Sequence, residues 1–427
     1  MSVYDIRKSY EANLAHGPNL ALESLPFTLV GQPRHEFFGK KLNSRLGIPA
    51  GLLLDSCWVR LYARLGFDIL TYKTVRTRPQ ASLTYPNCLL IGASAPWERG
   101  AIPDSVKVSN RYRPLTEISM TNSLGMPSQS PEVWQPDIAK SKDYLQPGQM
   151  LIVSVVGTAE DNHPARFIRD FVRAAALAAE AGAEAIELNF SCPNAPVAEG
   201  HIYEAPDFAR QITRAVRQQV KDLPVLIKVG YLAEDQRLAE LLAAVSDDVN
   251  GMVAINSLKL TVVDQQGGQA LPGPGRTASG VSGYALKALA RDFIRRLASL
   301  REQKHYDFKI LAVGGILTPQ DFQNFLDLGA DAALSCTGAM WDPYLALRYH
   351  SQYSLPPQNL SPAKIMDFRE CGVPDQIENT LKAEHWRGDN EILYPPDLER
   401  CPICGEPLEP VPPEAPRYCR CRLMPDC

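Results

Sequence analysis

The sequence predicts an α/β protein built as a (β/α)8 barrel, the TIM barrel, and three observations support this. Eight short apolar runs rich in Val, Ile and Leu recur along the 427 residues, as expected of buried parallel strands. Segments with the apolar spacing of helices follow most of these runs. Most runs end in polar residues, and in a barrel all such strand ends converge on one mouth. A doubly wound open sheet, which has the same alternation of elements, is the alternative.

Strands and helices alternate in chain order. The predicted strands are 46-LGIPAGL, 68-DILTYKT, 150-MLIVSVVG, 184-EAIELNFS, 224-PVLIKVG, 250-NGMVAIN, 309-KILAVGG and 331-DAALSCT. The predicted helices are 55-DSCWVRLYARLG, 165-ARFIRDFVRAAALAAEAGA, 206-PDFARQITRAVRQQV, 235-DQRLAELLAAVSD, 283-GYALKALARDFIRRLASL and 319-PQDFQNFLDLGA. Several of the helical segments close with Gly, a common helix stop.

Two stretches fall outside this alternation. Residues 76–118 are long and irregular, so we expect a loop or a small hairpin there, either as a functional lid or as a plain surface insertion. From about residue 354 the chain is rich in proline and polar residues, with one expected helix at 361-SPAKIMDFRE. These features predict a barrel domain at 1–356 with a core of about 45–350, a linker and helical segment at 357–400, and a tail at 401–427.

Composition limits the class of protein. The chain is 45% hydrophobic and 22% charged, and its net charge of −4 gives no basic field for nucleic acid or an anionic membrane. We expect neither a signal peptide nor a membrane span. Five of the ten cysteines lie in the last 27 residues, which is unlike a secreted disulfide framework. A cytoplasmic enzyme with a metal-binding tail is therefore expected.

Polar residues and glycines gather at the predicted strand ends. Four carboxamides carry both donors and acceptors without charge, which suits a flat polar ring. Gly314 and Gly315 permit close approach of a phosphate, and a following helix start would bind it. Lys228, inside an apolar strand, needs an anionic partner such as a cofactor ring. These strand-end residues are Ala50, Gly51, Lys73, Thr74, Ser154, Asn189, Cys192, Asn194, Lys228, Asn256, Ser257, Gly314, Gly315 and Thr337, and the loop 121-TNSLGMP adds Asn122.

Each of these residues also has an ordinary structural interpretation. Two glycines after a strand most often form a turn, an Asn at a strand end is usually a turn former, and a single Cys is usually a small core residue. Their coincidence at one end of one predicted barrel is what favours a site.

Together these stretches resemble the dihydroorotate dehydrogenase family, and in particular its class 1, cytosolic branch with a catalytic cysteine. The shared motifs run in family order from about residue 45 to 350, and 188-LNFSCPN is the most specific of them. The others are 49-PAG, 72-YKT, 122-NSLGMP, 226-LIKVG, 254-AINS, 280-GVSGYALKALA and 313-VGGI. Dihydropyrimidine dehydrogenase carries a similar catalytic domain, so fold and cofactor follow more directly than the substrate does.

The resemblance implies FMN-dependent oxidation of (S)-dihydroorotate to orotate in pyrimidine biosynthesis, with a hydride passing to N5 of FMN and a proton to Cys192. It implies a homodimer and an acceptor that is either fumarate or a partner delivering electrons to NAD. It assigns FMN to Ala50, Gly51, Lys73, Thr74, Ser154, Asn189, Lys228, Ile255, Gly283, Gly314, Gly315, Cys336 and Thr337. It assigns the substrate to Lys73, Asn122, Ser123, Leu124, Gly125, Met126, Asn189, Asn194, Asn256 and Ser257.

The chain departs from the family at several positions. The family usually has Asn in place of Ser154, Gly in place of Cys336 and a second Asn in place of Ser128, and its segment corresponding to 76–118 is shorter. A different dihydropyrimidine or cyclic amide as the substrate is therefore an alternative. A non-catalytic barrel scaffold whose tail is an interaction module is the alternative from another class.

The tail carries metal-ligand spacing in 401-CPICGEPLEP and 418-YCRCRLMPDC. A CPxCG knuckle folds its backbone around a metal, and the Gly permits the tight turn. A structural Zn²⁺ site is favoured, an iron site is the alternative, and unligated thiols are the third interpretation. The expected ligands are Cys401, Cys404, Cys419 and Cys421, with Cys427 as a substitute for one of them.

Overall fold

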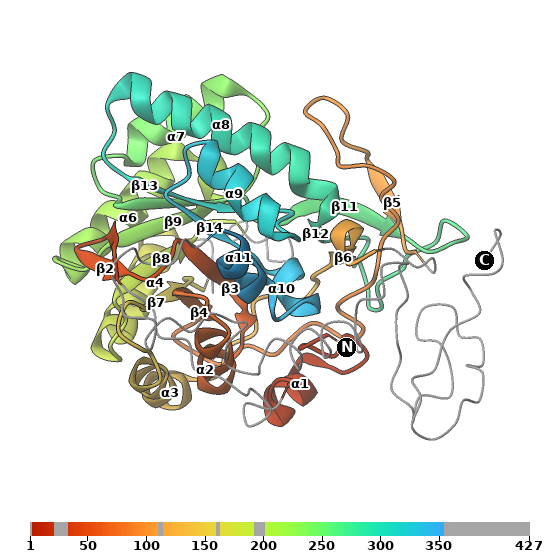
Figure 1. Ribbon diagram of the computed structural model, residues 1–427, viewed down its shortest axis with the longest axis horizontal. Coiled ribbons are helices and arrows are strands. Elements are labelled where there is room, and N and C mark those ends of the chain that lie inside the picture. Colours follow the sequence, from red (N-terminus) through yellow and green to blue (C-terminus); the bar gives the residue numbers. More distant parts are fainter. Residues whose placement is uncertain (1, 21–32, 110–113, 159–162, 192–200, 354–427) are drawn as a thin grey trace.

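A closed barrel of eight parallel strands forms the centre of the molecule (Figure 1). The computed structural model describes residues 2–20, 33–109, 114–158, 163–191 and 201–353. The strands follow the ring order β10-β13-β14-β3-β4-β7-β8-β9. Their bounds are β3 (Leu46–Leu53), β4 (Ile69–Val75), β7 (Met150–Val155), β8 (Ala185–Asn189), β9 (Val225–Val229), β10 (Gly251–Ala254), β13 (Lys309–Val313) and β14 (Ala332–Leu334). All eight are the predicted runs, and the closure by β9 and β10 shows that the open-sheet alternative is wrong.

Helices surround this barrel (Figure 1). Those that the sequence predicts are α2 (Ser56–Arg64), α4 (Pro164–Glu180), α6 (Pro206–Val220), α7 (Asp235–Val245), α8 (Lys287–Lys304) and α9 (Pro319–Asp327). Those that it misses are α1 (Tyr10–His16), α3 (Pro131–Asp143), α10 (Thr337–Trp341) and α11 (Leu345–Tyr353). The interior proline Pro136 in α3 and the short length of α1 and α10 weaken their sequence signals. Length does not explain why α11 is missed, because it has nine residues, as many as α2 and α9. The expected helix at 361–370 lies outside the described residues.

Side chains alternate between two cores, as the period of two along a strand requires. On β8, Ala185 packs inside the barrel against Ile152 and Leu226, whereas Ile186 and Leu188 join the larger core toward the helices. The hairpin of β1 (His35–Phe37) and β2 (Lys40–Leu42) adds Phe37 and Leu42 to the inner core. The inner core therefore fills most of the barrel interior, and it reaches the C-terminal strand ends at Val313 and Leu334.

A second sheet of four strands stands beside the barrel (Figure 1). Its order is β5 (Ser105–Lys107), β11 (Leu258–Val263), β12 (Ala278–Gly283) and β6 (Ser119–Thr121). The expectation of a loop or hairpin for 76–118 is wrong at β5, which pairs in parallel with residues 261–263 of β11. The partner strand lies about 155 residues away in the chain, so no local sequence pattern predicts this pairing.

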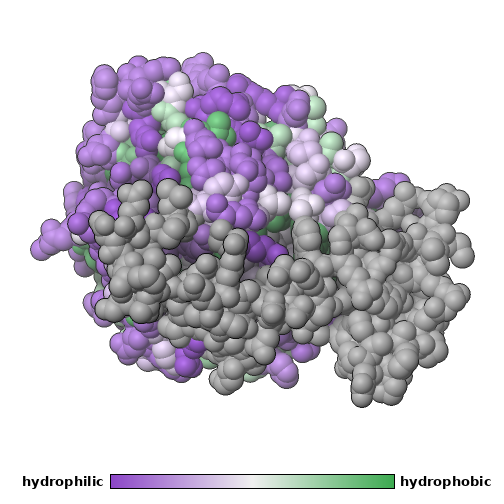
Figure 2. Space-filling view, in the orientation of Figure 1, coloured by the Kyte–Doolittle hydropathy of each residue, from purple (hydrophilic) through white to green (hydrophobic). Residues whose placement is uncertain are grey.

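The described surface is mainly hydrophilic on the face that Figure 2 shows. Within the described ranges, no helix combines the length and the apolar character that crossing a membrane requires.

Candidate active site

A cavity opens at the C-terminal ends of the barrel strands, where the sequence predicts the site. It encloses about 1260 Å³ of space between atoms, with the open solvent at its mouth included. Predicted residues that line it are Ala50, Gly51, Lys73, Thr74, Asn122, Leu124, Gly125, Met126, Asn189, Lys228, Ile255, Asn256, Ser257, Gly283, Gly314, Gly315, Cys336 and Thr337. Cys192 and Asn194 lie outside the described residues.

Three of the predicted carboxamides meet in this cavity. Asn122, just after β6, donates from Nδ2 to Oγ of Ser257 over 3.0 Å. The backbone N–H of Ser257 in turn donates to Oδ1 of Asn256 over 2.8 Å, and Nδ2 of Asn256 donates to the carbonyl of Ser191. These bonds tie the end of β6, the end of β10 and the end of β8 together, so the amide groups are held in fixed orientations around the cavity.

Asn189 belongs to a second polar chain at the base of the cavity. Its Nδ2 donates to Oγ1 of Thr74 over 3.0 Å, and Thr74 shares a 3.0 Å hydrogen bond with Oγ of Ser154. Ser154 is fully buried and does not line the cavity itself. The structure therefore brings Ser154 to the site as a support of Thr74.

Two lysines lie at the cavity with different environments. Nζ of Lys73 donates to the carbonyl of Pro127 over 2.5 Å and lies 5.0 Å from the centre of the Tyr10 ring. Nζ of Lys228 donates to the carbonyl of Ala50 over 3.3 Å. Both lysines are about 95% buried, so each brings a positive charge into a largely apolar wall.

Glycines leave room beside these groups. Gly51 has φ +130°, and a Cβ built there would meet no atom within 4 Å, so the cavity wall is open at that point. Gly283 has φ +93°, and its Cβ would lie 2.3 Å from the carbonyl oxygen of Ile118. A larger residue at 283 would displace the strand end that lines the cavity. At these glycines a flat ring could therefore lie close against the backbone of the cavity wall.

The helix start after the two glycines is already capped. Oδ2 of Asp321 accepts the backbone N–H groups of Leu317 and Thr318, each over 3.0 Å, and pairs with Nζ of Lys287 over 2.9 Å. An acid in this turn disfavours a bound phosphate. The anion-binding N–H groups would therefore come from the loop at Gly314 and Gly315 and not from the first turn of α9.

The loop after β6 is shaped by the 76–118 insertion. Leu83 N–H donates to the carbonyl of Leu124 over 3.0 Å, and Nε of Arg76 donates to the carbonyl of Met126 over 3.2 Å. Met126 has φ +51°, a backbone conformation that an unsupported loop rarely keeps. Part of the insertion is therefore a support for the cavity loop.

Ser123 points away from the cavity that its neighbours line. Its Oγ accepts a hydrogen bond from Nη2 of Arg276 over 2.9 Å, and Arg276 also donates to the carbonyl of Thr84. Arg276 comes from the connection between β11 and β12 and joins it to both the cavity loop and the insertion. The sequence offers no signal for this arginine, because Ser123 and Thr84, the partners that join it to the cavity loop and the insertion, lie far away in the chain.

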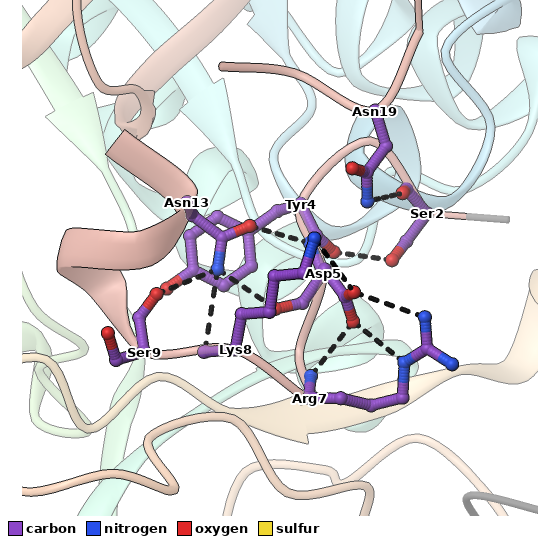
Figure 3. Close-up of polar contacts among 8 residues, drawn as sticks. All are labelled: Ser2, Tyr4, Asp5, Arg7, Lys8, Ser9, Asn13 and Asn19. Carbon is purple, nitrogen blue, oxygen red and sulfur yellow. Dashed lines mark hydrogen bonds and ion pairs between the residues drawn. The ribbon is translucent and has the colours of Figure 1, made fainter. Parts of the chain in front are cut away.

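The N-terminal segment supplies a wall that the sequence did not predict. Tyr4 lines the cavity beside Cys88 and Met340. Figure 3 shows how the segment is braced: Asp5 accepts from the backbone and the guanidinium of Arg7, and the Asn13 side chain bridges Asp5 and the start of α1. An aromatic residue this near the start of a chain carries no motif that would identify it.

Two cavity thiols are poor bases. Burial raises the pKa of Cys88 to about 12. Burial also raises the pKa of Cys336, although the positive charge of Lys228 lowers it in part. Both residues are therefore neutral thiols near pH 7, and neither suits proton abstraction there.

Comparison with known proteins places the chain in a family. Residues 110–348 match the dihydroorotate dehydrogenase family. A dihydroorotate dehydrogenase of Dictyostelium discoideum is 36% identical over 359 residues, which is 82% of this chain and 96% of the relative. The chain belongs to the dihydroorotate dehydrogenase family. It is therefore an oxidoreductase acting on CH–CH donors. The predicted oxidation of dihydroorotate is confirmed at the level of the family. The family also implies FMN as the cofactor.

Other similar proteins match a smaller share of this chain. An NAD-dependent dihydropyrimidine dehydrogenase subunit of Escherichia coli is 34% identical over 205 residues, 47% of this chain and 46% of that protein. The catalytic subunit of an NAD⁺-type dihydroorotate dehydrogenase B from Staphylococcus carnosus is 28% identical over 53% of this chain and 68% of the relative. A solved dihydroorotate dehydrogenase of Eimeria tenella, in complex with ferulenol, shares the fold, with a TM-score of 0.56, 17% identity, and coverage of 73% of this chain and 80% of that one.

Proposed function

We propose that this chain oxidises (S)-dihydroorotate to orotate in pyrimidine biosynthesis and uses FMN to do so. The observation that carries the proposal is the meeting of Asn122, Asn189 and Asn256 beside Lys228 in one cavity of a dihydroorotate dehydrogenase barrel. Three neutral amides can hold a pyrimidine ring by its alternating C=O and N–H groups. The buried cation beside them suits a ring that gains negative charge.

The cavity residues fit FMN. When bound, FMN would accept the hydride from C6 of the substrate at its N5. The open wall at Gly51 leaves room for the flat ring, and Lys228 would stabilise its negative charge after reduction. Loop N–H groups at Gly314 and Gly315 would hold the phosphate. The remaining proposed contacts are Ala50, Lys73, Thr74, Asn189, Ile255, Gly283, Cys336 and Thr337, with Ser154 acting through Thr74.

The substrate would lie under the loop after β6. Asn122, Asn256 and Ser257 already share hydrogen bonds, so a ring entering between them would meet amides that are oriented in advance. Leu124, Gly125 and Met126 line the same side, and Lys73 is held there by Pro127. Asn194 completes the proposed set of carboxamides.

Cys192 is the proposed base that removes the proton from C5. It lies outside the described residues, three positions after Asn189 and directly after Ser191, whose carbonyl accepts from Asn256. The base must act on the face of the ring opposite the flavin, and a thiolate at position 192 would supply it. The high pKa of Cys88 supports this choice, because it argues against a competing cavity thiol.

A cysteine at position 192 also supports placing the chain in the class 1, cytosolic branch of the family. The acceptor would then be fumarate or a partner that passes electrons to NAD.

A different dihydropyrimidine as substrate is the second candidate, favoured by the 34% identity with the dihydropyrimidine dehydrogenase subunit. A non-catalytic scaffold finds no support in these similarities. A homodimer is proposed on the family resemblance, and light scattering of the purified protein tests it.

The cysteines of the tail lie outside the described residues, and a Zn²⁺ site there is proposed from their spacing. Cys401, Cys404, Cys419 and Cys421 would be the ligands, with Cys427 as the substitute and iron as the alternative metal. Elemental analysis of the purified full chain, with a Cys401→Ser/Cys404→Ser variant as control, tests this. One zinc per chain that the variant loses supports the site, and equal metal content in both proteins rejects it.

The test of the activity is anaerobic stopped-flow mixing of FMN-loaded protein with dihydroorotate, following flavin absorption. Rapid bleaching in the wild type, much slower bleaching in Cys192→Ala and an intermediate rate in Cys192→Ser are expected. A flavin-loaded wild type that dihydroorotate leaves oxidised, but dihydrouracil reduces, would replace the first candidate by the second. Protein that neither contains nor binds FMN would reject both.

A further inference from the structure

Glu187 is a buried carboxylate inside the barrel, beneath the cavity. It lies on β8 between Ile186 and Leu188, which face the helices, so its side chain shares the inward direction of Ala185 and Asn189. Its exposed fraction is 0%. Glu187 therefore occupies the layer of the barrel interior directly below Asn189.

Among the described residues, the carboxylate makes no hydrogen bond of ordinary length. Neither Oε1 nor Oε2 of Glu187 makes a hydrogen bond to any described group. Ser154 lies level with it on β7, but the described hydrogen bond of its hydroxyl is to Thr74. A buried ionisable group without such hydrogen bonds destabilises the fold, so a compensating interaction is expected nearby.

Lys228 provides that interaction. In the parallel pairing of β8 with β9, Glu187 lies opposite Leu226 and Asn189 lies opposite Lys228, so the lysine is one layer nearer the mouth. On the two neighbouring strands, β7 and β9, Lys228 is the sole charged residue among the described positions. Burial raises the pKa of Glu187, whereas the positive charge of Lys228 and the nearby Ser154 hydroxyl lower it in part.

We propose that Glu187 is a positioning residue whose carboxylate offsets the charge of Lys228 and so lowers the reduction potential of the flavin bound above it. The inference rests on the proposed FMN site. Lys228 alone favours the reduced ring, because that ring carries negative charge. A carboxylate one layer below weakens this attraction and makes the reduced flavin a better donor to the next acceptor.

The experiment compares Glu187→Gln with the wild type in the FMN-loaded full chain, by anaerobic titration against reference redox dyes. Gln has nearly the same shape as Glu but no charge. Its flavin equilibrium should shift at least tenfold toward the reduced form, which is about 30 mV for a two-electron couple. Glu184→Gln is the matched control, because Glu184 precedes the same strand at its other end and pairs with Lys40. That variant should keep the wild-type potential.

Three results would overturn the inference: an unchanged potential in Glu187→Gln, a shift toward the oxidised form, or an equal shift in Glu184→Gln. A chain that binds no FMN would instead reject the proposed function, and the shift in the pKa of Glu187 on folding then remains measurable by unfolding in urea at several pH values. A raised pKa in the folded state means that the wild type loses stability as pH rises past the ordinary Glu value toward that raised pKa. Glu187→Gln should therefore gain stability relative to the wild type at pH 8, and the gain should vanish near pH 4. A stability difference that still grows with pH above 7 would show that Glu187 stays protonated in the folded chain, and this would overturn the inference.

Discussion

The side chains of Asn122 and Ser257 form a hydrogen bond at the cavity. Nδ2 of Asn122 donates to Oγ of Ser257 over 3.0 Å, although the two residues are 135 positions apart in the chain. One follows β6 of the side sheet and the other follows β10 of the barrel, so this contact joins the two sheets at the place where the substrate is expected. The amide of Asn122 is thereby oriented before any ligand arrives.

Removing the Ser257 hydroxyl should therefore weaken binding through Asn122. In Ser257→Ala the Asn122 amide loses an anchor, and we expect kcat/KM for dihydroorotate to fall roughly 10- to 100-fold, mostly through KM. Steady-state kinetics on Asn122→Ala, Ser257→Ala and the double variant measure the coupling between them. Effects that add in the double variant would show that the two residues act independently.

Arg276 should control the cavity loop without touching the substrate. Its guanidinium donates to the hydroxyl of Ser123 over 2.9 Å and to the carbonyl of Thr84, a forked arrangement that Lys cannot reproduce. Both Arg276→Lys and Arg276→Met should raise KM several-fold and leave flavin content unchanged. Ser123→Ala, which removes one of the acceptors, should have a smaller effect. Wild-type kinetics in Arg276→Met would mean that other contacts hold the loop.

How far the sequence predicts this molecule depends on the range of the interactions. The eight barrel strands are predictable because each is a local apolar run with polar residues at its end, as in 224-PVLIKVG. The strand β5 and the wall residue Tyr4 are not, because a distant partner, β11 or the cavity, decides their structure. Ser123 belongs to a predicted motif, yet only the position of Arg276 shows that its hydroxyl faces away from the cavity.

The ring of Tyr10 should matter more than its hydroxyl. Nζ of Lys73 lies 5.0 Å from the ring centre, and such a cation–π contact contributes about 0.5–2 kcal/mol. Tyr10→Phe keeps the ring and should retain kcat/KM within about two-fold, whereas Tyr10→Leu should lose roughly 3- to 30-fold. Thermal unfolding of both variants separates this loss from a general loss of stability. Equal kcat/KM in the two variants would show that the Tyr10 ring makes no functional contact with Lys73.

Thiol reactivity should distinguish Cys57 from Cys88 in the native protein. Cys57 is exposed at the start of α2, whereas burial raises the pKa of Cys88 to about 12. Iodoacetamide at pH 7.5, followed by peptide mass spectrometry, should therefore modify Cys57 and leave Cys88 intact until urea unfolds the chain. Partial burial and the Asp55 charge also raise the pKa of Cys57, so its rate should keep increasing above pH 9. Labelling of native Cys88 as fast as that of Cys57 would mean that the cavity wall formed by the N-terminal segment opens in solution.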